Sequence, residues 1–267
     1  MRGSAGRLAS LPGVPIVPVH PEAVPIFHEG DRTAVLLVHG FTGSPKSLRP
    51  WAEDLHARGH TVSVPRLPGH GTHWREMNRT TWAEWYAEAE RELERLRDRS
   101  DHVVVGGLSM GGAIALRLAE LRGDLVDGIV LVNPVVGIDD VRLRALPVLK
   151  HVVAGFPGIS NDIKKPGQDE CAYDRVPLKA LHSQVGGWAE VVADLGRVHQ
   201  PLLLFRSRVD HVVPASSSAR VLERVSSADT TEVVLEDSFH VATLDNDAPA
   251  IFAETADFLR RITKESE

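Results

Sequence analysis

Gly106-Gly107-Leu108-Ser109-Met110-Gly111-Gly112 is the stretch that decides the fold of this 267-residue chain. A β-branched run at residues 102–105 precedes it, and residues 113–120 after it are mostly good helix formers. Ser109 therefore stands where a strand turns sharply into a helix. Such a turn needs glycine on both sides of the serine, because a Cβ at either position would collide with the neighbouring chain. Gly-x-Ser-x-Gly in this setting predicts a nucleophile elbow with an exposed hydroxyl.

The composition indicates one globular domain. Hydrophobic residues make up 43% and charged residues 25%, which is typical of a soluble protein, and no apolar run is long enough to cross a bilayer. The net charge of −6 gives no reason to expect a nucleic-acid partner. Cys171 is the only cysteine and cannot form an internal disulfide, so we expect a cytoplasmic protein.

Strands and helices alternate along the chain. Residues 1–20 are predicted to be a flexible leader, and residues 21–267 a single domain. We expect strands at about 24–28, 33–38, 61–64, 102–105, 128–133, 201–206 and 231–235, and helices at about 45–58, 81–99, 113–120, 215–225 and 247–262. This alternation predicts an α/β fold with a mostly parallel central sheet and helices on both faces.

Nearly seventy residues separate the expected strands at 128–133 and 201–206. A crossover between parallel strands needs only a helix and two short loops, so this segment holds more than one connection. We expect part of it, at about residues 135–180, to be a small cap inserted over the sheet.

A serine hydroxyl needs a neighbouring base to become a nucleophile, and that base needs an acid to orient it. In α/β-hydrolases the chain order is serine, acid, histidine, with each residue following a strand. Ser109, Asp210 and His240 occur in this order, and Asp210 and His240 each lie shortly after an expected strand. Asp237 is a second candidate for the acid, but it shares a loop with His240 and follows the wrong strand. The sequence therefore predicts the triad Ser109, Asp210 and His240.

The oxyanion that forms during acyl transfer needs two hydrogen-bond donors. Met110 follows the nucleophile at the start of a helix, and Phe41 follows the strand at 33–38, between Gly40 and Gly43. We expect the backbone N–H groups of Phe41 and Met110 to form the oxyanion hole.

Other candidate motifs carry less weight. His70 between two glycines is typical of a packed turn, and Trp82 and Trp85 of a helix face in the core. The acids and histidines show no metal-ligand spacing, and one cysteine cannot build a thiolate zinc site. No metal ion or organic cofactor is expected.

Five motifs together resemble a known family. They are residues 39–45 (HGFTGSP), 65–73 (PRLPGHGTH), 107–112 (GLSMGG), 210–214 (DHVVP) and 240–245 (HVATLD). They are similar to motifs of bacterial monoacylglycerol lipases and the related thermostable carboxylesterases of the α/β-hydrolase superfamily, and the likeness extends over about residues 31–262. The resemblance implies the same triad and oxyanion donors. It further implies that Glu170 binds the glycerol head of the substrate.

The expected cap is unusually apolar. This part of the chain departs more freely from the family pattern, but its apolar residues are suited to lining an acyl-chain tunnel and to transient contact with a lipid surface. A cap helix packed on the sheet explains the same pattern. The apolar residues are Val135, Val136, Ile138, Val141, Leu143, Leu146, Val148, Leu149, Val152, Val153, Phe156 and Ile159.

The sequence thus predicts a serine ester hydrolase that cleaves monoacylglycerol to glycerol and a free fatty acid. A general carboxylesterase acting on short- to medium-chain esters is the alternative. A ligand-binding relative without turnover is disfavoured because the triad is intact. Dehalogenases and epoxide hydrolases are disfavoured because they carry an aspartate where this chain has Ser109. The oligomeric state is not indicated.

Overall fold

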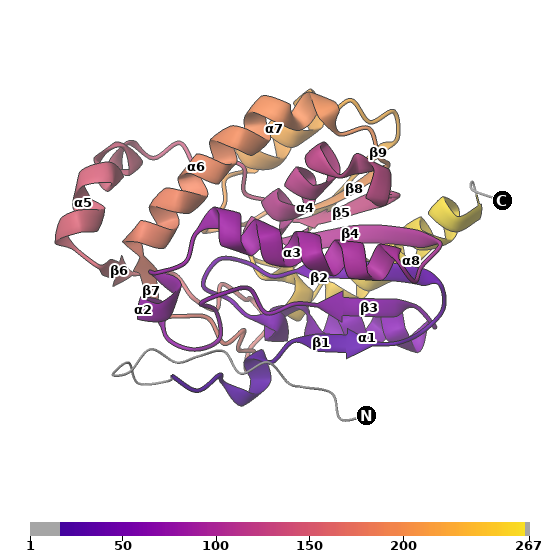
Figure 1. Ribbon diagram of the computed structural model, residues 1–267, viewed down its shortest axis with the longest axis horizontal. Coiled ribbons are helices and arrows are strands. Elements are labelled where there is room, and N and C mark those ends of the chain that lie inside the picture. The colour runs from indigo at the N-terminus through magenta and orange to yellow at the C-terminus, as the bar shows by residue number, and fades with distance from the viewer. Residues whose placement is uncertain (1–16, 265–267) are drawn as a thin grey trace, which may run out of the picture.

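A seven-stranded sheet forms the centre of the computed structural model, which describes residues 17–264 (Figure 1). Its strand order is β1-β3-β2-β4-β5-β8-β9, and only β1 runs antiparallel to its neighbour. The strands are β1 (Ile26–His28), β2 (Thr33–Val38), β3 (Thr61–Val64), β4 (His102–Leu108), β5 (Gly128–Val132), β8 (Leu202–Ser207) and β9 (Thr230–Leu235). The expected mostly parallel α/β sheet is confirmed.

Helices cover both faces of the sheet. Side chains of a strand alternate between the two faces, and in these buried strands the apolar side chains on each face pack against helices. Leu36 and Val38 of β2 pack in the cluster that includes α3, α4 and α6, whereas Val35 and Leu37 pack in the cluster that includes α1 and α8. The helices are α1 (Arg49–Ala57), α2 (Trp74–Met77), α3 (Trp82–Arg97), α4 (Met110–Leu121), α5 (Leu146–Val152), α6 (Leu178–Asp194), α7 (Ala215–Arg224) and α8 (Ala248–Lys264). None of these helices is long and apolar enough to span a membrane.

The element boundaries differ from the expected ones where 3-10 turns intervene. The helix expected from residue 45 begins with the 3-10 turn η2 (Pro45–Leu48), and the α-helix proper starts at Arg49. Further 3-10 turns are η1 (Pro21–Ala23), η3 (Gly123–Leu125), η5 (Leu195–Arg197) and η6 (Ala242–Leu244). Most of the leader expected over residues 1–20 lies outside the described residues. At its described end, the backbone N–H of His20 donates to the carbonyl of Gly71 at 2.7 Å.

The segment 135–180, called the cap segment below, carries η4 (Val141–Ala145), α5, β6 (Gly155–Pro157), β7 (Arg175–Pro177) and the start of α6. Strands β6 and β7 form a separate two-stranded antiparallel sheet. In Figure 1, α5 and this small sheet lie at one end of the molecule, beside α2 and the beginning of α6. Helix α6 then returns the chain to the central sheet at β8, so it is the crossover helix that the sequence pattern did not locate.

Among the glycines that the structure describes, Gly107 and Gly111 in the turn from β4 into α4 leave the least room for a Cβ. A Cβ on Gly107 would lie 2.2 Å from the carbonyl carbon of Gly111, and a Cβ on Gly111 would lie 1.8 Å from the carbonyl oxygen of Val38. Between them Ser109 has φ 57° and ψ −116°, a left-handed region that non-glycine residues rarely occupy. The collision expected at both flanking glycines is confirmed.

Gly111→Ala should therefore lower the free energy of unfolding by about 2 kcal/mol or more, because the new methyl group meets fixed backbone atoms. Gly186→Ala is the matched control: its Cβ would have no atom within 4 Å. Since Gly186 lies inside α6, this change should stabilise the protein by about 0.5–1 kcal/mol. Urea denaturation of both variants measures the two effects, and a Gly111→Ala protein as stable as wild type would contradict the packing argument.

Candidate active site

Ser109 opens into a cavity of about 410 Å³ above the carboxyl ends of the parallel strands. The polar part of its lining includes Ser109, Glu170 and His240, with the backbone of Gly40 nearby. The apolar part comes from the cap segment and α6, and includes Val135, Ile138, Leu143, Leu181 and Trp188. The cavity therefore combines a nucleophile with an apolar wall, which is typical of a site for a substrate with a hydrocarbon part.

Asp210 and His240 form a buried pair beside this cavity. The Nδ1 of His240 lies 2.8 Å from Oδ2 of Asp210, and their side chains are 9% and 7% exposed. The other carboxylate oxygen of Asp210 accepts the backbone N–H groups of Val212 and Val213, at 2.8 Å each. Both carboxylate oxygens of Asp210 are thus engaged, which holds the side chain in one orientation.

Asp237, the alternative acid, is placed elsewhere. Its side chain is 56% exposed and forms an ion pair with Lys164. Because β8 and β9 are parallel neighbours, the loops that follow them lie next to each other, and this places Asp210 beside His240. Asp237 lies shortly after β9, but its side chain is exposed to solvent. The geometry favours Asp210 as the partner of His240.

The pair sets the protonation states that base catalysis requires. Burial raises the pKa of Asp210, but the hydrogen bond and charge of His240, together with the backbone N–H groups of Val212 and Val213, outweigh burial, so the net shift is downward and the carboxylate is ionised. Burial lowers the pKa of His240, but the hydrogen bond and charge of Asp210, with smaller effects of Glu170 and Asp162, outweigh burial and the net shift is upward. An ionised Asp210 accepts the proton on Nδ1, which leaves Nε2 free to exchange a proton with a serine.

A buried histidine holds the loop that carries Phe41. The Nδ1 of His39 lies 3.0 Å from the carbonyl oxygen of Gly40, and its Nε2 accepts the backbone N–H of Leu67 at 3.2 Å. These contacts require the proton on Nδ1, and burial keeps the ring neutral by lowering its pKa to about 4. His39 is therefore a structural residue that joins the loop after β2 to the loop after β3.

Of the two expected oxyanion donors, Phe41 lines the cavity together with Ser109, and Met110 follows Ser109 in the chain. Gly40 is so close to the nucleophile that a Cβ on it would lie 3.4 Å from the Cβ of Ser109. Met110 is the first residue of α4, where backbone N–H groups have no intrahelical acceptor. Within residues 17–264, neither the N–H of Phe41 nor that of Met110 donates a hydrogen bond to the protein. Both groups are thus available to a substrate oxygen.

The turn around His70 packs against this loop, as expected. His70 is fully buried, its ring lies 4.9 Å from that of His39, and it also packs edge-on against Trp85. Trp85 contacts the ring of Phe41 at 5.9 Å and donates from Nε1 to the carbonyl of Pro68 at 3.0 Å. Trp82 and Trp85 are both core residues, which confirms that prediction.

Glu170 reaches the same cavity from the cap segment. It is 9% exposed, and its Oε1 accepts the backbone N–H of Asn161 at 3.0 Å. Burial raises the pKa of this carboxyl group. Its second oxygen lies beside Gly43, because a Cβ on that glycine would be 3.5 Å from Oε2.

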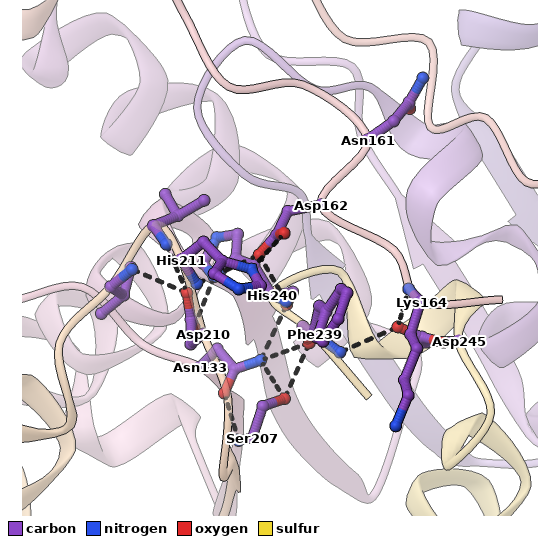
Figure 2. Close-up of polar contacts among 12 residues, drawn as sticks. Asn133, Asn161, Asp162, Lys164, Ser207, Asp210, His211, Phe239, His240 and Asp245 are labelled. Atoms are coloured by element: carbon purple, nitrogen blue, oxygen red, sulfur yellow. Dashed lines mark hydrogen bonds and ion pairs between the residues drawn. The ribbon is translucent and has the colours of Figure 1, made fainter. Parts of the chain in front are cut away.

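Sequence reasoning missed two residues that hold the catalytic loops (Figure 2). Asn133 follows β5 with φ 45°, and its side-chain amide donates to the carbonyl of His240 at 2.8 Å and accepts the backbone N–H of Ser207 at 2.7 Å. Its position directly after a buried strand was a usable signal. Asp162 contacts the backbone N–H of His240 from the cap segment, and nothing in the local sequence indicates that contact.

A group of metal-ligand type forms at the surface from residues far apart in the chain. Ligand atoms of His20, Glu22 and Cys171 lie within 4.8 Å of one another. The Lys46 ammonium lies among them, 2.7 Å from Glu22 Oε2 and 3.5 Å from Cys171 Sγ. Because this fixed positive charge opposes a divalent cation, we assign the group no metal.

The fold and this arrangement of serine, histidine and aspartate define the protein as an α/β-hydrolase. Residues 30–247 match the family described as serine aminopeptidase, S33, and the chain belongs to this family.

Two relatives that match about nine tenths of the chain are ester hydrolases by name. The chain is 39% identical to a thermostable monoacylglycerol lipase of Bacillus sp. (strain H-257), over 91% of this chain and 97% of the relative. It is 26% identical to a carboxylesterase of Bacillus subtilis (strain 168), over 89% and 96%. A solved structure from work on the metagenome-derived lipolytic enzymes LipS and LipT is 38% identical, with a TM-score of 0.89, over 91% of this chain and all of that one. These matches confirm the family resemblance seen in the motifs.

Asp210→Asn should reduce kcat by about 10⁴-fold, because the amide no longer fixes the proton on Nδ1 of His240. Wild-type activity should fall as the pH drops through the raised pKa of His240, since only the neutral ring accepts a proton. In the variant the effect of burial on the pKa of His240 is no longer offset by Asp210, so this pKa should fall. The loss of activity on the acidic side of the pH profile should then occur at lower pH. Rate measurements between pH 4 and pH 9 test both points. Asp237→Asn is the matched control, and a comparable loss in that variant would reverse the assignment of the acid.

Proposed function

We propose that this protein hydrolyses monoacylglycerols to glycerol and free fatty acids through an acyl-enzyme. The observation that carries the proposal is a buried carboxyl group, Glu170, in the same apolar-walled cavity as Ser109 and His240. A carboxylate that accepts hydrogen bonds is suited to glycerol hydroxyls, and the apolar wall is suited to an acyl chain. The 39% identical relative, a monoacylglycerol lipase by name, supports the same substrate class.

The proposed reaction assigns one role to each residue of the site. His240 Nε2 takes the proton of Ser109 as Oγ attacks the ester carbonyl, and Asp210 stabilises the imidazolium that forms. The backbone N–H groups of Phe41 and Met110 donate to the oxyanion. His240 then gives its proton to the leaving glycerol oxygen, and the acyl group stays on Ser109. A water molecule activated by His240 releases the fatty acid by the same steps.

A general carboxylesterase would use the same residues but would not need Glu170. The 26% identical relative from Bacillus subtilis, a carboxylesterase by name, supports this alternative. The two functions differ in whether the enzyme gains rate from the free hydroxyl groups of glycerol.

Glu170→Gln should lower kcat/KM for a medium-chain monoacylglycerol by about 10-fold or more, because the amide offers one acceptor oxygen where the carboxyl group has two, and the N–H of Asn161 already occupies one of those two. Hydrolysis of a nitrophenyl ester of the same acyl chain should change by less than about twofold, since that substrate lacks the glycerol hydroxyls. Ser109→Ala provides the blank for both assays. Equal losses on the two substrates would leave Glu170 without a part in glycerol recognition and would support the carboxylesterase.

We also propose that the cap segment contacts the lipid surface that supplies the substrate. Val141, Val148, Val152 and Ile159 are 73%, 70%, 78% and 61% exposed. Arg144 and Lys150 lie in the same stretch and are suited to anionic headgroups. Exposed apolar side chains with basic neighbours are typical of a surface that docks on a lipid interface.

Replacing Val148 and Val152 together by glutamate should weaken association with vesicles containing anionic lipid, because two charges replace buried methyl groups at the interface. Co-sedimentation with the vesicles measures this, and hydrolysis of a water-soluble nitrophenyl ester should be unchanged. The matched control places glutamate at Val24 and Leu121, two exposed apolar residues outside the cap segment. If both double variants sediment like wild type, the cap does not dock on lipid.

A further inference from the structure

Two adjacent residues of the cap segment contact both functional ends of the cavity. Asn161 binds Glu170, and Asp162 binds the loop that carries His240. Figure 2 shows Asp162 directed toward His240 and His211. Asn161 lies on the same loop, farther from the two histidines (Figure 2). The pair thus connects the carboxyl group proposed to bind glycerol with the proposed general base.

Asp162 uses its side chain and its backbone in this contact. Oδ2 accepts the backbone N–H of His240 at 3.1 Å and that of His211 at 3.3 Å, and Oδ1 lies 2.8 Å from Nδ1 of His211. Its carbonyl oxygen accepts the N–H of Val241 at 3.1 Å. The side chain is only 10% exposed. Asp162 therefore holds the loop after β8 and the loop after β9 at once.

Asn161 fixes Glu170 by a reciprocal pair of hydrogen bonds. Its backbone N–H donates to Oε1 of Glu170 at 3.0 Å, and its side-chain Oδ1 accepts the backbone N–H of Glu170 at 2.9 Å. Asn161 has φ 55°, a left-handed conformation that asparagine tolerates better than most residues. With this backbone conformation the side chain of Asn161 binds Glu170, while the side chain of the next residue, Asp162, binds His240.

A second carboxylate clamps the same loop a few residues further along. Asp245 is 1% exposed, and its Oδ2 accepts the backbone N–H of Lys164 at 2.7 Å and that of Phe239 at 2.9 Å. Residues 161–164 are therefore joined to residues 239–241 at two points, through Asp162 and through Asp245. A shift of one segment should move the other with it.

We propose that Asn161 and Asp162 are positioning residues that set the place of Glu170 relative to His240, and so couple glycerol recognition to catalysis. This inference rests on the proposed function for the role of Glu170. A head group that binds Glu170 is thereby held at a fixed distance from the imidazole that must protonate its oxygen. Since small misplacements of reacting groups cost much rate, this connection determines specificity.

The charge of Asp162 also acts on the base. The groups facing His240 are Asp210 from the loop after β8, Asp162 and Glu170 from the cap segment, and His211 beside Asp162. The negative charge of Asp162 favours the imidazolium form of His240, so its removal should lower the pKa of that ring.

Two substitutions of Asp162 separate position from charge. Asp162→Asn keeps an oxygen for the backbone N–H groups and offers its amide to His211, so the plateau kcat should stay within about threefold while the acidic limb moves to lower pH. Asp162→Ala removes the hydrogen bonds, and its plateau kcat should fall by about 100-fold on every ester. Asp139→Asn, a 77% exposed aspartate of the same segment, is the matched control and should change neither quantity.

Asn161→Ala tests the other end of the connection. It should reduce the preference for monoacylglycerol over a nitrophenyl ester by about 10-fold, and it should have no further effect when Glu170 is already glutamine. Circular dichroism and thermal unfolding verify that each variant is folded. If the Asp162→Ala protein is unfolded, the Asp162→Asn and Asn161→Ala variants provide the test.

The results distinguish the two proposals. An unshifted acidic limb in Asp162→Asn together with wild-type kcat in Asp162→Ala would overturn the role of Asp162. Additive effects of Asn161→Ala and Glu170→Gln would overturn the role of Asn161. An enzyme with no preference for monoacylglycerol would refute the proposed substrate, and the pH and kcat effects at Asp162 would still be measurable on a nitrophenyl ester.

Discussion

The close approach of α4 to β2 is the constraint on which the rest of the molecule depends. Only a hydrogen atom fits between Gly111 and the carbonyl of Val38, and only a hydrogen atom fits between Gly107 and Gly111. With the helix this near the sheet, the chain between them has room for a single strained residue, Ser109. The strain is tolerated because β4 lies in the middle of the sheet, paired with β2 and β5 and covered on both faces.

The parallel sheet then gathers the remaining groups. The loops after β2, β5, β8 and β9 all leave the same edge as the loop after β4, because the strands run in one direction. They supply Phe41, Asn133, Asp210 and His240 around Ser109. Hydrogen bonds between the loops, such as those of His39 and Asn133, replace the regular ladder once the strands have ended.

Most of this arrangement was predictable from the sequence, because each part leaves a local pattern. Buried strands appear as apolar runs, the elbow as glycines around a serine, and Asp210 and His240 as polar residues shortly after strands. The long interval before β8 indicated an insertion, but α6 was not located, because its amphipathic pattern lies next to the apolar cap. The start of α1 was misplaced because Pro45 initiates a 3-10 turn as readily as an α-helix.

Contacts between the cap segment and the sheet loops were beyond sequence reasoning. Asp162 lies 78 residues before His240, and Asn161 binds Glu170 through a left-handed backbone at a position that is not a glycine. The sequence by itself determined the strand-turn-helix at Ser109, the chain order of the triad and the class of fold, since these depend on local periodicity and on glycine sterics. Only the tertiary structure decided which cap residues hold Glu170 and His240 in place. Those choices depend on how distant loops pack against one another, and hydrogen bonds between such loops leave no periodic trace in the chain.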